Sequence, residues 1–199
     1  MIKLPNVTLI CIDCVNHASA IKAIFKSIEQ IEFGKVKFLT DKLLFSEKFE
    51  TIIIDKINSK QEYSKFVLTK LNEYIDTDFI LIIQYDGYVI NPNLWKDYFL
   101  NFDYIGAPWW YEDGYNVGNG GFSLRSKKLL NSLPDNPNLE WPEDHYICRL
   151  ISNELKEYFH IKFAPESIAK LFSYEPNPKH PEFKNNSFGF HGIPSLILK

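Results

Sequence analysis

The stretch Ile80-Leu-Ile-Ile-Gln-Tyr-Asp-Gly-Tyr-Val-Ile-Asn-Pro92 decides the fold that this sequence predicts. Its first four residues are apolar, which is typical of a strand buried on both faces of a parallel sheet. Asp86 and Gly87 follow that strand, and a second short run over 88–90 stops at Asn91-Pro92. A carboxylate at the carboxyl end of a buried strand lies where open α/β sheets bind their ligands. Asp-Gly is also a strong hairpin signal, so this stretch alone leaves both interpretations open.

Strands and helices alternate in the segments before this stretch. A β-rich run over 7–12 ends at Asp13, and apolar residues at helical spacing predict a helix over 18–31 that Gly34 closes. We expect the next elements to be strands over 36–39 and 51–54 and a helix over 62–75. A strand, a helix and a strand in direct succession form a βαβ unit, so the sequence predicts a parallel sheet.

The segments after this stretch are shorter and more varied. The pattern predicts a short helix over 95–102, a helix through 129–130, a loop over 133–142, a helix over 143–158 and a strand over 161–164, with 187–192 closing the fold. No repeat or linker divides the chain. We therefore expect one domain over 1–199, of the α/β class, with a single Rossmann-like, mostly parallel sheet flanked by helices.

Composition limits the partners and the compartment. The chain has 199 residues, 45% of them apolar, and 22 Lys and Arg against 25 Asp and Glu give a net charge of −3. Without a clustered basic run we expect no nucleic-acid partner. No signal peptide or transmembrane run is visible, and the chain has three cysteines, so we expect a cytoplasmic protein without a disulfide framework. The Cys11-x-x-Cys14 pair has redox spacing, but Cys11 lies in an apolar run, which favours a buried structural role.

Two polar segments carry candidate chemistry. Gly118-Asn-Gly-Gly121 lets the backbone approach a ligand closely, although it has neither Rossmann nor P-loop spacing. Glu143 and Asp144 stand at a predicted helix start. The helix dipole alone favours acids there, but one of them could instead be a general base.

Aromatic residues and one late histidine add to this set. His191 lies between Phe190 and Gly192 and is either a ligand or a surface residue. Trp109 and Trp110 are consecutive beside a proline and cannot both face inward from a strand, so we expect one of them to be an exposed stacking surface.

Taken in order, four motifs resemble nucleotide-sugar glycosyltransferases of the GT-A type. They are Gln84-Tyr-Asp-Gly-Tyr-Val89, Gly118-Asn-Gly-Gly-Phe-Ser-Leu-Arg125, Pro142-Glu-Asp-His-Tyr-Ile147 and Phe190-His191. Their order is similar to that of the inverting β-1,3-galactosyltransferase and Fringe group. The chain also resembles a glycosyltransferase-like bacterial and viral domain family of unknown function. This resemblance spans most of residues 5–192 and implies a GT-A fold.

The resemblance also implies roles for individual residues. Asp86 matches the last Asp of the family's Asp-x-Asp motif and, with His191, would bind the metal. Gln84 stands where the first Asp would be, which is a departure, because glutamine brings no charge. Asp144 matches the catalytic base, with Glu143 as the fallback. The residues expected to contact the donor substrate are Asp13, Asn16, Gly87, Asn119, Gly120 and Gly121. Asp13 and Asn16 are expected there because of the sheet topology. The residues expected to contact the acceptor substrate are Trp109, Trp110 and Trp141.

The implied activity is the metal-dependent, inverting transfer of a hexose from a UDP-sugar to a glycan or glycoconjugate. Manganese suits mixed carboxylate and imidazole ligands better than magnesium, which is the second choice. One alternative is a catalytically inactive GT-A-like module that binds a nucleotide sugar or glycan, since Gln84 replaces an acid and the chain is small. A nucleotide-binding dehydrogenase or hydrolase is a third class, but its fingerprints are absent. The sequence leaves the oligomeric state open.

Overall fold

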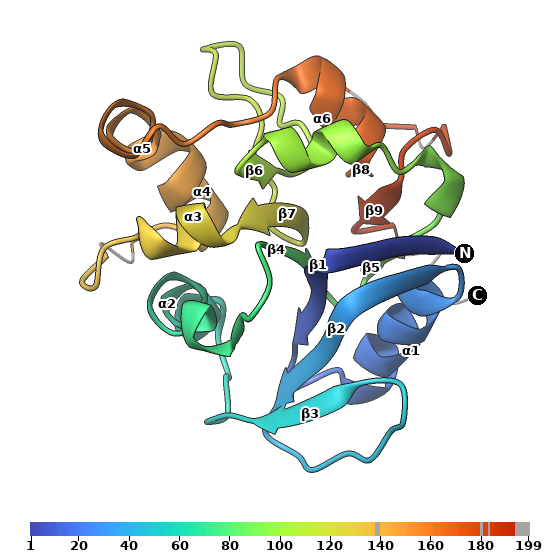
Figure 1. Ribbon diagram of the computed structural model, residues 1–199. Coiled ribbons are helices and arrows are strands. Elements are labelled where there is room, and N and C mark those ends of the chain that lie inside the picture. The colour runs from blue at the N-terminus through green and yellow to red at the C-terminus, as the bar shows by residue number, and fades with distance from the viewer. Residues whose placement is uncertain (138–139, 180, 183, 194–199) are drawn as a thin grey trace.

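The computed structural model describes residues 1–137, 140–179, 181–182 and 184–193 (Figure 1). Its main sheet has six strands in the order β3-β2-β1-β4-β7-β6. The neighbours β3, β2, β1 and β4 run parallel, whereas β7 is antiparallel to both β4 and β6. The strand bounds are β1 Ile2–Ile12, β2 Ile31–Thr40, β3 Glu50–Ile53, β4 Phe79–Ile83, β6 Tyr104–Ile105 and β7 Phe122–Ser126. The predicted α/β class with a mostly parallel sheet is confirmed.

The strand β4 lies at the centre of the molecule, as its four apolar residues predict. It pairs with β1 on one side and with β7 on the other. Ile80, Leu81, Ile82 and Ile83 are all fully buried. Because successive side chains of a strand point to opposite faces, Leu81 and Ile83 enter one core cluster and Ile80 and Ile82 enter another.

A second, three-stranded sheet has the order β5-β9-β8. It contains β5 Gly87–Val89, β8 Ser173–Tyr174 and β9 Gly189–His191. Asp86 does lie in a turn, in which the Gly87 N–H donates to the Gln84 carbonyl at 3.1 Å. The turn is not a hairpin, however, because β4 and β5 belong to different sheets and Gly87 pairs with His191.

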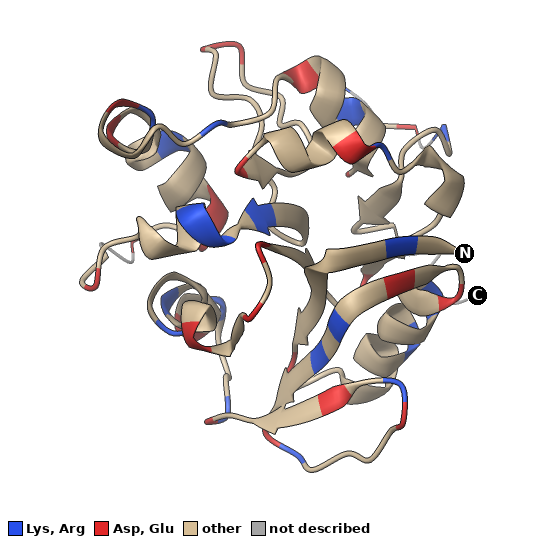
Figure 2. Cartoon of the chain, viewed as in Figure 1, with Lys and Arg blue, Asp and Glu red and all other residues tan. Residues whose placement is uncertain are grey.

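Helices cover the two faces of the main sheet (Figure 1). The helix α1 (His17–Ile28) packs its buried Ala20, Ala23 and Ile24 into the cluster on one face. The helix α2 (Lys60–Thr69) contributes Val67 to the cluster on the other face. The shorter helices are α3 Lys127–Asn131, α4 Glu143–His145, α5 Ser152–Phe159 and α6 Glu166–Phe172. Basic and acidic residues are both distributed around the molecule (Figure 2).

The first predicted helix ends earlier than its apolar pattern indicates. It stops at Ile28, and Ile31 already begins β2. Gly34 therefore does not close a helix but lies inside β2, where an added Cβ would come within 2.0 Å of the Pro5 carbonyl oxygen. The glycine allows a close approach of β1 and β2 at the point where their register shifts.

Four other predicted elements are shorter or more irregular than expected. The helix predicted over 62–75 begins at Lys60, ends at Thr69 and continues as a 3₁₀ turn, Leu71–Tyr74. The 95–102 helix is a 3₁₀ segment, Asp97–Asn101, and the 143–158 helix is split by a π-helical turn, Tyr146–Leu150. The predicted strand over 161–164 forms only an isolated bridge between Tyr104 and Phe163. Asn138 and Leu139 of the predicted loop lie outside the described residues.

Two further observations concern the cysteines and the possibility of a membrane-spanning helix. Cys11, Cys14 and Cys148 are buried free thiols, as the apolar setting of Cys11 indicates. Within the described ranges, no helix combines the length and the apolar character needed to cross a bilayer.

Candidate functional site

A cavity of about 450 Å³ opens at the carboxyl ends of β1 and β4. It gathers residues from segments that are far apart in the sequence, as expected for an open α/β sheet. The predicted residues that line it are Asp13, Asn16, Gln84, Asn119, Gly120, Gly121, Glu143, Asp144 and His191. Asp86 and Gly87 lie directly behind this wall, in the turn that joins β4 to β5. The structure therefore brings most of the predicted site together.

His191 stands between two carboxylates. Its Nε2 atom lies 3.2 Å from Asp86 Oδ1 and 3.1 Å from Gln84 Oε1, while its Nδ1 atom lies 3.1 Å from Glu175 Oε1. The side chains of His191 and Asp86 are both less than a fifth exposed. Asp86 Oδ1 is buried and has no directed hydrogen bond among the described residues. One imidazole nitrogen thus faces an orphaned carboxylate oxygen and an amide oxygen.

The charge of His191 follows from these neighbours. Burial alone would lower the pKa of its imidazole, but the interactions with Asp86 and Glu175 outweigh that effect and raise the pKa to about 10. At neutral pH this raised pKa makes the ring an imidazolium that both carboxylates stabilise. The Asp86 charge, followed by burial, also raises the pKa of the Tyr85 hydroxyl.

These residues fit a divalent cation when the His191 imidazole is neutral rather than protonated. A neutral imidazole that donates Nδ1–H to Glu175 would leave Nε2 free to ligate, and histidine ligands commonly have such a carboxylate partner. The buried Asp86 Oδ1, which accepts no directed hydrogen bond among the described residues, and the Gln84 Oε1 atom approach the same nitrogen. Within the described part of the chain, no set of three or more His, Cys, Asp or Glu side chains has metal-binding geometry. The protein would therefore offer two ligands of the usual kind, Asp86 and His191, and the Gln84 amide oxygen as a neutral third.

Asn119 connects this group to the glycine segment. Its Nδ2 donates to Glu175 Oε2, and its Oδ1 accepts from the Gly121 N–H at 3.2 Å. An added Cβ at Gly121 would lie 2.2 Å from His191 Nε2, so only glycine leaves room for the imidazole. The neighbouring Gly120 is equally constrained from the other side, because its Cβ would lie 2.4 Å from Glu143 Oε1.

Asp144 lies on the far side of Gly120. Its Oδ2 accepts from the Gly120 N–H at 2.8 Å, and its Oδ1 accepts from the His145 N–H at 2.7 Å. These two bonds fix the carboxylate in the cavity wall. Each oxygen can accept a further hydrogen bond, because a carboxylate oxygen has two lone-pair positions.

Glu143, the fallback base, is buried in an ion pair with Arg125. Its side chain is 6% exposed and lies 3.0 Å from Arg125 Nη2, and Arg125 itself is fully buried on β7. The Ser64 hydroxyl on α2 accepts from the Glu143 N–H at 3.1 Å and lies 3.4 Å from Glu143 Oε2. Burial and then the charge of Asp144 raise the pKa of the Glu143 carboxyl. Because Arg125 already holds its carboxylate, Glu143 is the less accessible of the two acids.

The first-strand residues form the opposite wall of the cavity. Asp13 Oδ1 accepts from the Val15 and Asn16 N–H groups at 2.7 and 2.5 Å, which folds the loop after β1. The Asn16 side chain makes no capping hydrogen bond to α1, although the residue is the N-cap. Its exposed amide is thus available to a ligand.

The predicted acceptor tryptophans have unequal exposure. Trp110 is 47% exposed and Trp141 is 46% exposed, whereas Trp109 is partly buried against Gly118. The exposed member of the consecutive pair is therefore Trp110. Trp141 stacks on His145 with ring centroids 4.5 Å apart, directly beside Asp144 in the sequence.

Three site residues were not predicted. Glu175 follows the two-residue strand β8, which carries no apolar pattern, and no sequence signal connects it to His191. Arg125 was noted only as the end of a motif, because a fully buried arginine is exceptional. Tyr63 lies on α2, and its hydroxyl is buried, has no hydrogen bond among the described residues and has a pKa raised by burial.

Comparisons with known proteins agree with this fold. The family model described as "Protein of unknown function (DUF5672)" matches residues 46–191. A search of curated proteins finds no match.

Two solved structures are glycosyltransferases of low sequence identity. One is "a glycosyltransferase involved in the glycosylation of the major capsid of PBCV-1", with 12% identity, a TM-score of 0.54 and coverage of 96% of each chain. The other is the apo form of the glycosyltransferase GlyE of Streptococcus pneumoniae TIGR4, with 13% identity and a TM-score of 0.50. That match covers 94% of this chain but only 54% of GlyE. The likeness shows a shared fold.

Proposed function

The chain belongs to the DUF5672 family, and we propose that it is a metal-dependent glycosyltransferase of the GT-A type. In this proposal it moves a hexose from a UDP-sugar to a hydroxyl of a glycan or glycoconjugate, with inversion, as in the β-1,3-galactosyltransferase and Fringe group. The shared fold with two glycosyltransferases supports a glycosyl-transfer function.

One observation carries the proposal. Gly120 and Gly121 are consecutive, and the first contacts the Asp144 carboxylate while the second leaves room for the His191 ring. A candidate base and a candidate phosphate-binding centre therefore stand side by side in one cavity. A transfer reaction needs both, because a nucleophile must lose a proton while a diphosphate departs.

Asp144 is the proposed general base. It takes the proton of the acceptor hydroxyl as the oxygen forms its bond to the anomeric carbon and the bond to the diphosphate breaks. A single displacement of this kind inverts the anomeric configuration. The hydrogen bonds from Gly120 and His145 orient the carboxylate for this role.

Asp86 and His191, with Gln84, would hold the metal, and Mn²⁺ suits this mixed donor set better than Mg²⁺. When bound, the cation supplies positive charge that stabilises the departing diphosphate. Asp13, Asn16 and Asn119 are the proposed contacts to the nucleotide, and Trp110 and Trp141 are the proposed stacking surfaces for the acceptor.

A thermal-shift panel tests this function. UDP, GDP, CDP and their sugars are each added with and without Mn²⁺, because a ligand that binds only the folded state raises the unfolding temperature. We expect a metal-dependent shift with UDP that is lost in both Asp86→Ala and His191→Ala. The matched control is Glu157→Ala, an exposed acid of α5 that does not line the cavity. A metal-dependent shift that survives both variants would contradict the metal site.

A second candidate is an inactive module that holds a nucleotide sugar or glycan. The observation that favours it is the pairing of His191 with both Asp86 and Glu175, which makes the imidazole cationic without any metal. A protonated imidazole can itself bind a diphosphate. Release of UDP from a UDP-sugar by the purified protein, abolished by Asp144→Asn, would exclude this module.

A further inference from the structure

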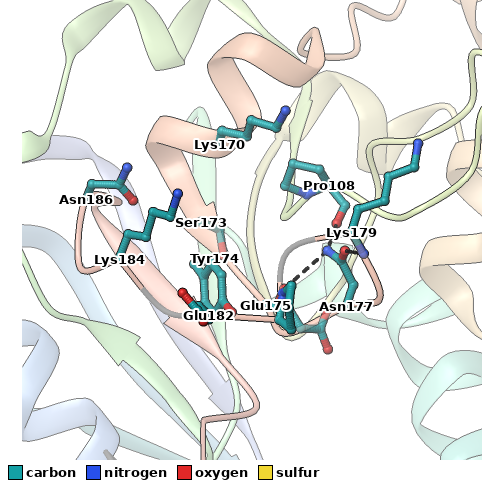
Figure 3. A pocket seen from close by; sticks show the side chains of 11 residues that line it. Pro108, Lys170, Ser173, Tyr174, Glu175, Asn177, Lys179, Glu182, Lys184 and Asn186 are labelled. Carbon is teal, nitrogen blue, oxygen red and sulfur yellow. Dashed lines mark hydrogen bonds between the residues drawn. The ribbon is translucent and has the colours of Figure 1, made fainter.

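A second cavity, of about 340 Å³, lies on the other side of Glu175 (Figure 3). It is formed by α6, by β8 and by the segment that follows β8, together with Pro108. Its volume is within the range of about 300–1,000 Å³ that small-ligand sites usually have. None of the four motifs that resemble glycosyltransferases contributes a residue to its wall.

Three lysines line this cavity and give it a positive character. Lys170 comes from α6, and Lys179 and Lys184 come from the segment after β8, so their amines approach from different sides (Figure 3). Glu175 and Glu182 also line the cavity, so its wall carries one more basic than acidic side chain, although the whole chain has a net charge of −3. This local balance requires an explanation. An anion bound among these amines would provide one.

The amines can reach a ligand without breaking strong interactions. Lys170 pairs with Glu166 at 2.5 Å and Lys179 with Glu112 at 2.9 Å, but all four of these side chains are at least one-third exposed. Exposed ion pairs contribute little to stability, so an incoming anion can replace them. Lys184 makes no ion pair within the described residues.

Two carboxylates also line the cavity and must be weighed against the lysines. Glu175 is already engaged, because its oxygens contact His191 Nδ1 and Asn119 Nδ2. Glu182 lies near Tyr174, where, after burial, its charge raises the pKa of the phenol. Of the three lysines, Lys170 and Lys179 hold exposed ion pairs that a ligand can displace, and Lys184 has no ion pair among the described residues, so an anionic ligand can be accommodated.

The other lining groups are those that sugars need. Tyr174 and Pro108 supply apolar surface, and Asn177 and Asn186 supply amides. Asn177 is held in place because its Nδ2 donates to the carbonyls of Pro108 and Glu175 at 3.1 and 3.3 Å (Figure 3). An apolar face with a few fixed polar groups is characteristic of small-molecule sites.

The cavity adjoins the candidate active site. Glu175 lines the cavity and contacts His191, and Pro108 lines it next to Trp109, which packs on Gly118. A glycan long enough to reach across this shared wall would occupy both places at once. The cavity is therefore placed to bind a part of the acceptor that does not react.

We propose that this lysine-lined cavity binds an acidic sugar of the acceptor glycan, one that carries a carboxylate or a phosphate; this inference rests on the proposed function. The lysines pair with the anionic group, and Tyr174 and the two asparagines contact the ring and its hydroxyls. The substrate class of the enzyme is accordingly an acidic glycan.

Saturation-transfer NMR titrations of the full chain test the proposal with three probes. They are methyl β-glucuronide, glucose 6-phosphate and methyl β-glucoside, which distinguish a carboxylate, a phosphate and a neutral sugar. We expect one anionic probe to bind at least about tenfold more tightly than the neutral probe at low salt, since hydrogen bonds to charged groups are stronger than those between neutral groups. Which anionic probe binds more tightly identifies the acidic group.

Variants assign the binding to the cavity. Lys184→Gln and Lys179→Gln should each weaken the preferred anionic probe about tenfold. The matched control is Lys65→Gln, because Lys65 is an exposed lysine on α2 that lies outside both cavities. Equal binding of anionic and neutral probes, or equal losses in all three variants, would overturn the proposal.

The same samples separate this inference from the proposed function. The UDP-dependent thermal shift should be unchanged in Lys184→Gln and lost in His191→Ala. A UDP shift without any preference for an acidic probe rejects the cavity proposal alone. A preference for an acidic probe without any UDP shift rejects the transferase and leaves an acid-sugar site that supports the cavity assignment.

Discussion

Arg125 Nη2 lies 3.0 Å from Glu143 Oε1, and this ion pair joins β7 to the first turn of α4 beneath the candidate site. Arg125 also donates from Nε to Ser123 Oγ at 3.1 Å and lies over the Tyr104 ring. The pair fixes the point from which Asp144 projects. Its loss should therefore affect both stability and the position of Asp144.

We predict that Glu143→Ala lowers the free energy of unfolding by about 3–5 kcal/mol, because it leaves the buried Arg125 charge without a partner. Urea unfolding followed by circular dichroism measures this loss. The Arg125→Met/Glu143→Met double variant should lose much less than the sum of the losses in Arg125→Met and Glu143→Met, because it removes both charges. Additive losses would show that the two side chains are not coupled.

Asp144→Asn should lower the transfer rate by about two to four orders of magnitude, the usual scale for removal of a general base. The asparagine Oδ1 can still accept from the Gly120 N–H, so the fold and the UDP-dependent thermal shift should be retained. Initial rates of UDP release in the presence of acceptor provide the measurement. A wild-type rate in this variant would mean that Asp144 is not the base.

Gly121→Ala should abolish the metal-dependent UDP shift, because its Cβ would lie 2.2 Å from His191 Nε2. Gly118→Ala is the matched comparison, since its Cβ would strike the Trp109 ring at 2.0 Å and leave His191 untouched. Thermal shifts with UDP and Mn²⁺ distinguish the two variants. If both variants lose the UDP shift equally, the effect is a general disturbance of the loop.

Asp76 should stabilise the fold in a pH-dependent manner. The hydrogen bond from the buried Lys37 Nζ, 2.8 Å away, lowers the pKa of the Asp76 carboxyl. Because its folded pKa is below the unfolded value of about 3.9, the stabilisation is complete above that value and is lost as the pH falls through the folded pKa. Asp76→Asn should thus be less stable than the wild type at pH 7, and the two unfolding curves should converge in acid. An equal difference at pH 7 and pH 3 would contradict this assignment.

The central sheet was predictable because its signals are local. The apolar runs at 7–12 and 80–83 are each long enough to identify a buried strand, and the helix between 18 and 28 has a clear apolar stripe. Most of the site could be predicted as well, because its residues follow strand ends or stand in recognisable motifs. The predicted helix boundaries were wrong where a 3₁₀ or π turn replaced a regular α-helix, as at Tyr146–Leu150.

The remaining parts depend on contacts between distant segments. Glu175 meets His191 only because β8 and β9 pair, and both strands are very short. The burial of Arg125 depends on a carboxylate 18 residues further along the chain. Neither contact produces a periodic pattern in the sequence, so each can be identified only from the folded structure.

The pairing of β5 with β9 has a consequence for biosynthesis. Strand β7 completes its place in the main sheet with residues 122–126, but Gly87 obtains its partner only when His191 has been made. During translation, the central sheet can form while the Asp86 turn still lacks its imidazole. A nascent chain therefore passes through a stage in which its central sheet is complete while the Asp86–His191 contact of the candidate site has yet to form.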